Sequence, residues 1–218
     1  MPKHPIPTKK RRGGRPSQAE APRIRERILE IAAELFFAEG YGASSIEAVA
    51  RRAGISKRTL YARFRDKADL FAAVVHHVIG RLRPAHPEKL FEGGSAEEIL
   101  RRLASLILHA ALTPDALALY RTTLAEAARF PELAAVMNKG GGRQEAIGYI
   151  ARLLEKATAD GELRVKNPVF AAEQFLQLVV SAPQRRALGM GEPMTQTELD
   201  NWARDAADLF LNGCRKGA

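Results

Sequence analysis

From Ile24 onward, apolar residues recur with the spacing of one face of an α-helix, and no segment alternates as a β-strand would. The first stripe ends at Gly40 and consists of Ile28, Ile31, Ala32, Leu35 and Phe36. No internal repeat interrupts this pattern. The sequence therefore predicts an all-α protein.

Capping residues and helix breakers divide the chain into further helices. Ser44, with Glu47 three residues later, predicts the N-cap and capping box of a second helix. Gly54 is expected to end that helix and Ser56 to cap a third. Later helices are expected at residues 67–83, 95–111, 114–130, 131 to about 140, 144–159, 168–189 and 195–213. Pro183 should kink or split the helix that contains it.

The net charge of +9 is concentrated in the N-terminal third. Residues 1–66 carry fifteen Lys and Arg against seven Asp and Glu, whereas the rest of the chain carries nineteen against eighteen. This bias favours an anionic partner, either nucleic acid or an anionic membrane surface. Residues 1–20 contain almost nothing to bury and are expected to form a disordered basic arm, either a solvated tail or a DNA contact.

Other kinds of chemistry have little support in the sequence. Cys214 is the single cysteine, so no intramolecular disulfide is possible, and no His or Cys spacing suits a metal. Neither a Walker loop nor a dinucleotide-binding turn is present, so we expect no catalytic residue, cofactor or metal. The absence of a secretory signal and of a long apolar run predicts a soluble, cytoplasmic protein.

Three short helices with a glycine turn between the second and third predict a helix-turn-helix at about residues 45–64. Leu60 and Phe64 would form the buried edge of the third helix. Arg58 on the opposite arc could bond guanine O6 and N7, which predicts a base contact. Lys57, Thr59 and Tyr61 suit phosphate oxygens. The alternative is a solvated basic helix in an ordinary bundle.

These residues also resemble a known family. The stretches AAELFFAEGYGASSIEAVA, AGISKRTLYARF and DKADLF resemble the N-terminal domain of the TetR family of bacterial transcriptional regulators. The resemblance implies a DNA-binding domain at residues 21–83 and a double-stranded DNA operator as partner. It implies the following DNA contacts: Ser44, Ser45, Lys57, Arg58, Thr59, Tyr61, Arg63 and Lys67. Arg58 and Arg63 depart from many members, so the operator cannot be carried over from a relative.

Within residues 84–218, the stretches LYRTTLAEAARFPELAAVM and GELRVKNPVFAAEQFLQLV resemble the AefR-like C-terminal type of the family, which implies a helical domain for effector binding and homodimerisation. Apolar stripes near the end of the chain agree with a dimer, and Trp202 is the expected anchor. The expected interface residues are Phe175, Leu178, Trp202, Ala206, Leu209 and Phe210. Each stripe must also supply part of the core.

Polar residues among apolar ones in the middle helices are candidate contacts for a small-molecule effector. They are His109, Tyr120, Arg121, Glu126, Tyr149 and Gln174. Because these helices are rich in Leu, Ala and Ile, the effector is expected to be lipophilic or aromatic. The leading hypothesis is a homodimeric repressor that such an effector releases from a palindromic operator. The alternatives are an enzyme targeted to DNA, an architectural protein without an effector, and an activator.

Overall fold

A computed structural model of the chain describes residues 20–84, 86–140 and 142–214. Within these ranges the secondary structure is helical and contains no strand, which confirms the all-α prediction. The basic arm, apart from Glu20, lies outside the described residues. The elements are α1 (Glu20–Glu39), α2 (Ile46–Ala53), α3 (Lys57–Tyr61), α4 (Lys67–Leu82), the 3₁₀ helix η1 (Pro87–Phe91), α5 (Ala96–Ala111), α6 (Pro114–Glu126), α7 (Pro131–Gly140), α8 (Gly142–Ala159), α9 (Pro168–Ala187) and α10 (Gln196–Cys214).

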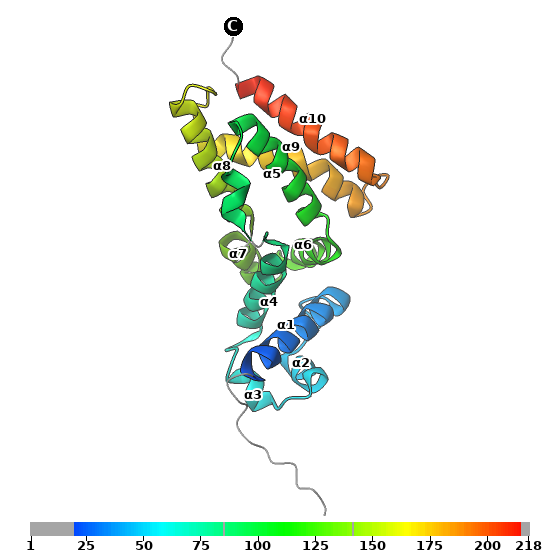
Figure 1. Cartoon of the computed structure of the whole chain (residues 1–218). Helices are drawn as coiled ribbons and strands as arrows, with labels where there is room; N and C mark the ends of the chain where they lie inside the picture. The colour runs from blue at the N-terminus through cyan, green and yellow to red at the C-terminus, as the bar shows by residue number, and fades with distance from the viewer. Residues whose placement is uncertain (1–19, 85, 141, 215–218) are drawn as a thin grey trace, which may run out of the picture.

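The helices form an elongated molecule with two ends (Figure 1). One end contains α1, α2 and α3, and the other contains α5, α8, α9 and α10. Between them lie α4, α6 and α7. Each end has its own buried cluster, but the N-terminal cluster also includes Leu119 from α6 and Leu133 from α7. The packing of the N-terminal end therefore extends beyond residue 83 to helices that come later in the chain.

Four aromatic rings join α1, α4 and the loop after α6. Tyr41 lies 5.6 Å from Phe36, 5.3 Å from Phe71 and 5.1 Å from Phe130, measured between ring centroids. The last two pairs are edge-on, an arrangement that aromatic rings prefer. Since Phe130 lies between α6 and α7 whereas the other three precede residue 72, this cluster ties the N-terminal end to the middle helices.

The second helix begins one residue later than expected. Ser45, and not Ser44, is its N-cap, and the Ser45 hydroxyl accepts a hydrogen bond from Ala48 N. Ser44 is only 3% exposed, and its hydroxyl donates to Leu35 O and Gly40 O. The prediction that Ser44 is the N-cap was wrong because this hydroxyl bonds the end of α1.

Pro183 lies inside α9 without splitting it, so the expected split was wrong, whereas the expected kink stays a prediction. A proline cannot donate to the carbonyl four residues earlier, here Val179 O. The indole Nε1 of Trp202 in α10 donates to this carbonyl at 3.0 Å and to Leu178 O at 3.2 Å. A side chain of the neighbouring helix thus satisfies the oxygen that the proline leaves unbonded.

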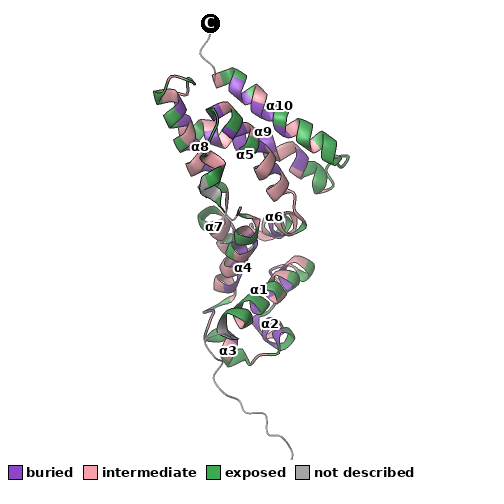
Figure 2. Cartoon of the chain, in the orientation of Figure 1, coloured by how far each residue is buried: buried purple, intermediate pink, exposed green. Residues whose placement is uncertain are grey.

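In the C-terminal half, Figure 2 shows α10 carrying buried, intermediate and exposed residues along its length. This is the pattern of a helix with one packed face. Its buried residues are Ala203, Ala206, Ala207, Phe210 and Leu211. They pack with α5 and α9 in the C-terminal core.

Within the described ranges, no single helix is long and apolar enough to cross a membrane. The pair α5 and α6, bent by 68°, meets the criteria of length and composition only when taken together.

Candidate nucleic-acid interface

The turn between α2 and α3 is built by a glycine and a serine. Gly54 has φ of +68°, a left-handed conformation that a glycine adopts without strain, and its N–H donates to Arg51 O at 3.2 Å. The Ser56 hydroxyl accepts from Thr59 N at 3.1 Å and so caps α3. Both capping predictions are confirmed. Together the two caps fix the direction in which α3 leaves α2.

Two buried side chains anchor α3 and its following turn to the N-terminal core. Leu60 and Phe64 are buried, as predicted, and the guanidinium of Arg25 lies 5.2 Å from the centroid of the Phe64 ring. α3 itself is shorter than expected, because it ends at Tyr61 and not at Phe64. The anchored edge leaves the opposite arc of α3 facing outward.

The outward arc carries most of the basic residues that the sequence singled out. Lys57, Arg58 and Tyr61 are exposed, and Thr59 is half-buried. Arg58 has no side-chain hydrogen bond or ion pair with any residue that the structure describes. Arg63 is partly buried, and its Nη1 donates to Thr59 O at 3.0 Å. The structure therefore gathers a lysine, an arginine and a phenol on one exposed surface.

A carboxylate from α2 lies against this surface. Glu47 Oε1 accepts a hydrogen bond from the Tyr61 hydroxyl at 3.3 Å and lies 3.7 Å from Lys57 Nζ. The sequence did not mark Glu47 as anything more than part of a cap. Only the structure, which places Glu47 beside α3, shows that this carboxylate contacts Lys57 and Tyr61.

Two residues expected on the DNA side are directed elsewhere. Ser44 is buried, so its side chain does not reach the exposed surface next to Ser45. Lys67 Nζ donates to Gly42 O at 3.2 Å and lies 4.4 Å from the centroid of the Tyr41 ring. Burial lowers the pKa of Lys67, while the nearby Glu126 carboxylate opposes that shift. The expectation that Ser44 and Lys67 contact phosphate stays a prediction.

The segment between α1 and α2 is held by the end of α6. Glu126 Oε2 accepts the Gly42 N–H at 2.6 Å. A Cβ atom added to Gly42 would lie 2.9 Å from that oxygen and 3.0 Å from the Phe130 ring, so a larger residue would displace the contact. Glu126 was expected to bind an effector. Its carboxylate joins the end of α6 to the segment that precedes the helix-turn-helix.

The other expected effector contacts do not gather at one place. His109 Nε2 lies 2.6 Å from Gln196 Nε2 and so joins α5 to α10. Tyr149 stacks on Phe91 of η1 with the ring centroids 5.4 Å apart. The remaining three are exposed on α6 and α9: Tyr120, Arg121 and Gln174.

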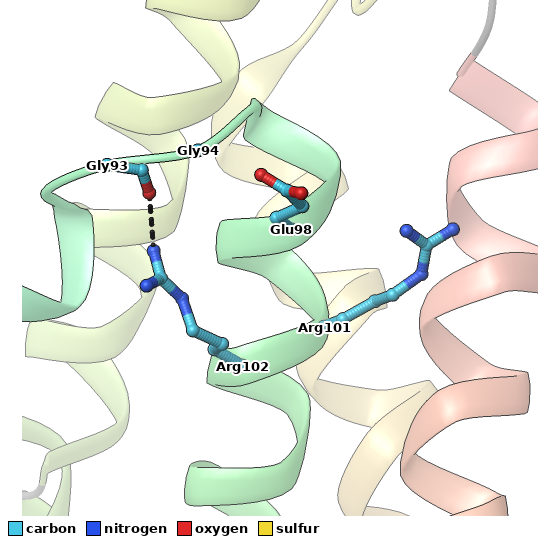
Figure 3. Close-up of a pocket in the computed structure, with 5 residues that line it drawn as sticks. All are labelled: Gly93, Gly94, Glu98, Arg101 and Arg102. Atoms are coloured by element: carbon cyan, nitrogen blue, oxygen red, sulfur yellow. Dashed lines mark hydrogen bonds between the residues drawn. The ribbon is translucent and has the colours of Figure 1, made fainter.

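Two hollows lie elsewhere in the C-terminal half. The first, of about 500 Å³, is formed by Gly93, Gly94, Glu98, Arg101 and Arg102 (Figure 3). In it Arg102 donates to Gly93 O, whereas Arg101 extends toward α10 and pairs with Asp208 at 2.7 Å. The second, of about 520 Å³, is lined by Ala182, Arg185, Arg186, Met190, Gly191 and Glu192. None of the six expected effector contacts lines either hollow.

The expected dimer residues divide into buried and exposed groups. Phe175, Ala206 and Phe210 are buried in the core of the single chain, and Phe175 and Phe210 pack edge-on at 5.1 Å. Their own chain covers most of these three side chains, and their part in an interface stays a prediction. Leu178 and Leu209 are exposed. Trp202 is partly buried and bonds α9.

A short exposed basic helix, anchored on a three-helix unit after a glycine turn, defines a helix-turn-helix DNA-binding protein. Residues 28–74 match the family model described as "Bacterial regulatory proteins, tetR family". Residues 98–213 match that of the "AefR-like transcriptional repressor, C-terminal domain". The chain belongs to the TetR family of bacterial transcriptional regulators, which are not enzymes.

Similar proteins support this assignment. A putative TetR-family regulator from Mesorhizobium loti MAFF303099 has a TM-score of 0.77 and 25% identity, over 92% of this chain and 100% of that chain. The Flavonoid-responsive Regulator FrrA has a TM-score of 0.73 and 31% identity, over 91% of this chain and 100% of that chain. The regulator AcrR of Shigella flexneri is 29% identical over 104 residues, which is 46% of this chain and 47% of that relative. This last alignment thus spans about half the length of the curated relative.

Proposed function

We propose that the chain is a homodimeric repressor that binds a palindromic operator and releases it when a small lipophilic or aromatic effector binds. The observation that carries this proposal is the exposed arc of α3, with Lys57, Arg58 and Tyr61 outward and Leu60 and Phe64 buried. Membership in a family of transcriptional regulators, typically repressors with ligand-binding C-terminal domains, supports it.

The proposed division of labour on the DNA side follows the chemistry of each side chain. Arg58, which is exposed, reads a base edge, because a guanidinium can bond guanine O6 and N7 together. Lys57, Tyr61 and the exposed N-cap Ser45 contact phosphate oxygens. Thr59 and Arg63 support α3 through the Arg63 to Thr59 O bond and lie at the edge of the contact.

The proposed dimer uses the exposed apolar residues of the last two helices. Leu178 on α9 and Leu209 on α10 are exposed, and the Trp202 indole fixes these two helices to each other. A two-fold dimer would present two copies of α3, and its symmetry requires a two-fold symmetric DNA site.

The proposed effector response rests on the helices that lie between the two ends of the molecule. A ligand can change DNA binding only if it binds one arrangement of the DNA-binding domains better than another. α4 joins the two ends covalently, and the Glu126 to Gly42 bond ties α6, one of the middle helices, to the N-terminal end. The name of the 31% identical relative, FrrA, describes a flavonoid response, which supports an aromatic effector.

Selection of binding sites from random DNA tests the DNA part of the proposal. We expect an inverted repeat, with half-sites about one helical turn, or roughly 34–36 Å, apart. Selected DNA without an inverted repeat would contradict a symmetric dimer on a palindrome.

Calorimetry tests the effector part. Coupling of about 1–3 kcal/mol would weaken operator binding roughly 5- to 150-fold, and operator must weaken effector binding by the same factor. If every tightly binding ligand had equal affinity with and without operator, the repressor would lack an effector switch, and the architectural role would be favoured.

A further inference from the structure

Glu47 stands out from its surroundings by charge. Residues 40–65 contain six Lys and Arg, and Glu47 is the one acidic residue among them. It comes from the first turn of α2, but its carboxylate reaches the outward side of α3. A negative charge here opposes the attraction between the proposed interface and phosphate.

The contacts of Glu47 involve the proposed phosphate-binding residues. Its Oε1 accepts from the Tyr61 hydroxyl at 3.3 Å and lies 3.7 Å from Lys57 Nζ. All three side chains remain accessible, since those of Glu47 and Lys57 are 38% and 66% exposed and Tyr61 is 47% exposed. DNA that approaches α3 must therefore compete with this carboxylate for Lys57 and Tyr61.

The carboxylate stays charged under neutral conditions. A hydrogen bond from its own backbone N–H and, more weakly, the charge of Lys57 lower the pKa of Glu47. An acidic residue in the first turn also stabilises a helix through the helix dipole. That role concerns only the backbone dipole of α2, however. It does not explain why this carboxylate contacts both Lys57 and Tyr61.

We propose that Glu47 lowers the affinity of the protein for duplex DNA of any sequence, because it competes with phosphate for Lys57 and Tyr61. Non-specific binding depends almost wholly on phosphate contacts, whereas operator binding adds base contacts such as the proposed one of Arg58. Because both kinds of binding include the same phosphate contacts, the loss of one such contact weakens both by a similar factor. This inference rests on the DNA binding proposed above.

Glu47→Gln tests the inference, because glutamine keeps an acceptor for Tyr61 and removes the charge. We expect affinity for random-sequence duplex DNA to rise about 3- to 10-fold at low salt, and the slope of log K against log salt to steepen by about 0.9, the value for one phosphate. Affinity for the selected operator should rise by a similar factor, so the ratio of operator to non-specific affinity should stay the same.

Glu34→Gln is the matched control. It removes the same charge and breaks an ion pair of the same kind, Glu34 to Arg52 at 2.8 Å, which does not involve α3. Equal changes in Glu47→Gln and Glu34→Gln would overturn the inference, as would an unchanged affinity of Glu47→Gln for random DNA. A loss of affinity on both DNAs would assign Glu47 to the stability of α2 alone and would also overturn it. If the wild-type protein showed no sequence preference, the proposed function itself would fail.

Discussion

At the scale of single residues, Lys57 and Arg58 are neighbours on α3 with different surroundings. Lys57 Nζ lies 3.7 Å from the Glu47 carboxylate, whereas Arg58 is exposed and has no side-chain partner in the described part of the chain. Arg58→Ala should cost about 1–3 kcal/mol on the operator and relax preference at one position in each half-site. Lys57→Ala should weaken all sequences alike and lower the salt slope by about one. Binding titrations on operator and mutated sites measure both, and equal, sequence-independent losses would show that Arg58 reads no base.

Because of Tyr41, the free energy of unfolding should depend on pH in the alkaline range. Burial, and then the charge of Glu132 at 3.3 Å from the hydroxyl, raise the pKa of Tyr41 well above its ordinary value. The folded protein therefore keeps the phenol proton at pH values at which the unfolded chain loses it. The contribution of Tyr41 to the free energy of unfolding is thus fully present below a pH of about 10 and falls as the pH rises further. Tyr41→Phe should reduce the loss of unfolding free energy between pH 10 and 11 by up to about 1.4 kcal/mol. Urea denaturation at several pH values measures this, with the exposed Tyr120→Phe as control; equal slopes in both variants would contradict the assignment.

At the scale of elements, Pro183 and Trp202 make α9 and α10 depend on each other. The indole donates to Val179 O, the carbonyl that Pro183 cannot bond. Trp202→Phe should therefore leave a carbonyl without a donor and cost about 1–3 kcal/mol, besides the lost packing. In a Pro183→Ala background the backbone N–H returns, so the same substitution should cost less. A double-mutant cycle by urea denaturation tests this, and additive costs would show that the indole does not replace the missing backbone bond.

At the scale of the whole molecule, the exposed apolar residues of α9 and α10 are expected to meet a second copy. Leu209 on α10 and Leu124 on α6 are both 63% exposed, so a charge should be tolerated equally well at either position in an isolated chain. If the last two helices form the dimer, Leu209→Glu should shift the protein to monomer and weaken operator binding, whereas Leu124→Glu should do neither. Sedimentation velocity distinguishes the two variants. A dimer that survives Leu209→Glu would place the interface elsewhere.

Local patterns in the sequence by themselves determined most of the secondary structure and the family. Gly54 and Ser56 are recognisable because a left-handed turn favours glycine and an N-cap favours serine, whatever surrounds them. Helical spacing likewise placed Leu60 and Phe64 inward, because it reports which face of a helix is buried. The motifs of residues 24–71 identified the TetR family, which the family models confirm.

Only the tertiary structure decided which partner each of several polar side chains has. The Ser44 hydroxyl donates to Leu35 O, nine residues away, and the Glu126 carboxylate accepts from Gly42 N, eighty-four residues away. The Trp202 indole donates to a carbonyl oxygen of another helix. Periodicity and capping rules carry no information about such contacts, because they describe neighbours within about one helical turn. The same limit concealed Glu47, whose place beside Lys57 depends on how the glycine turn folds α3 back toward α2.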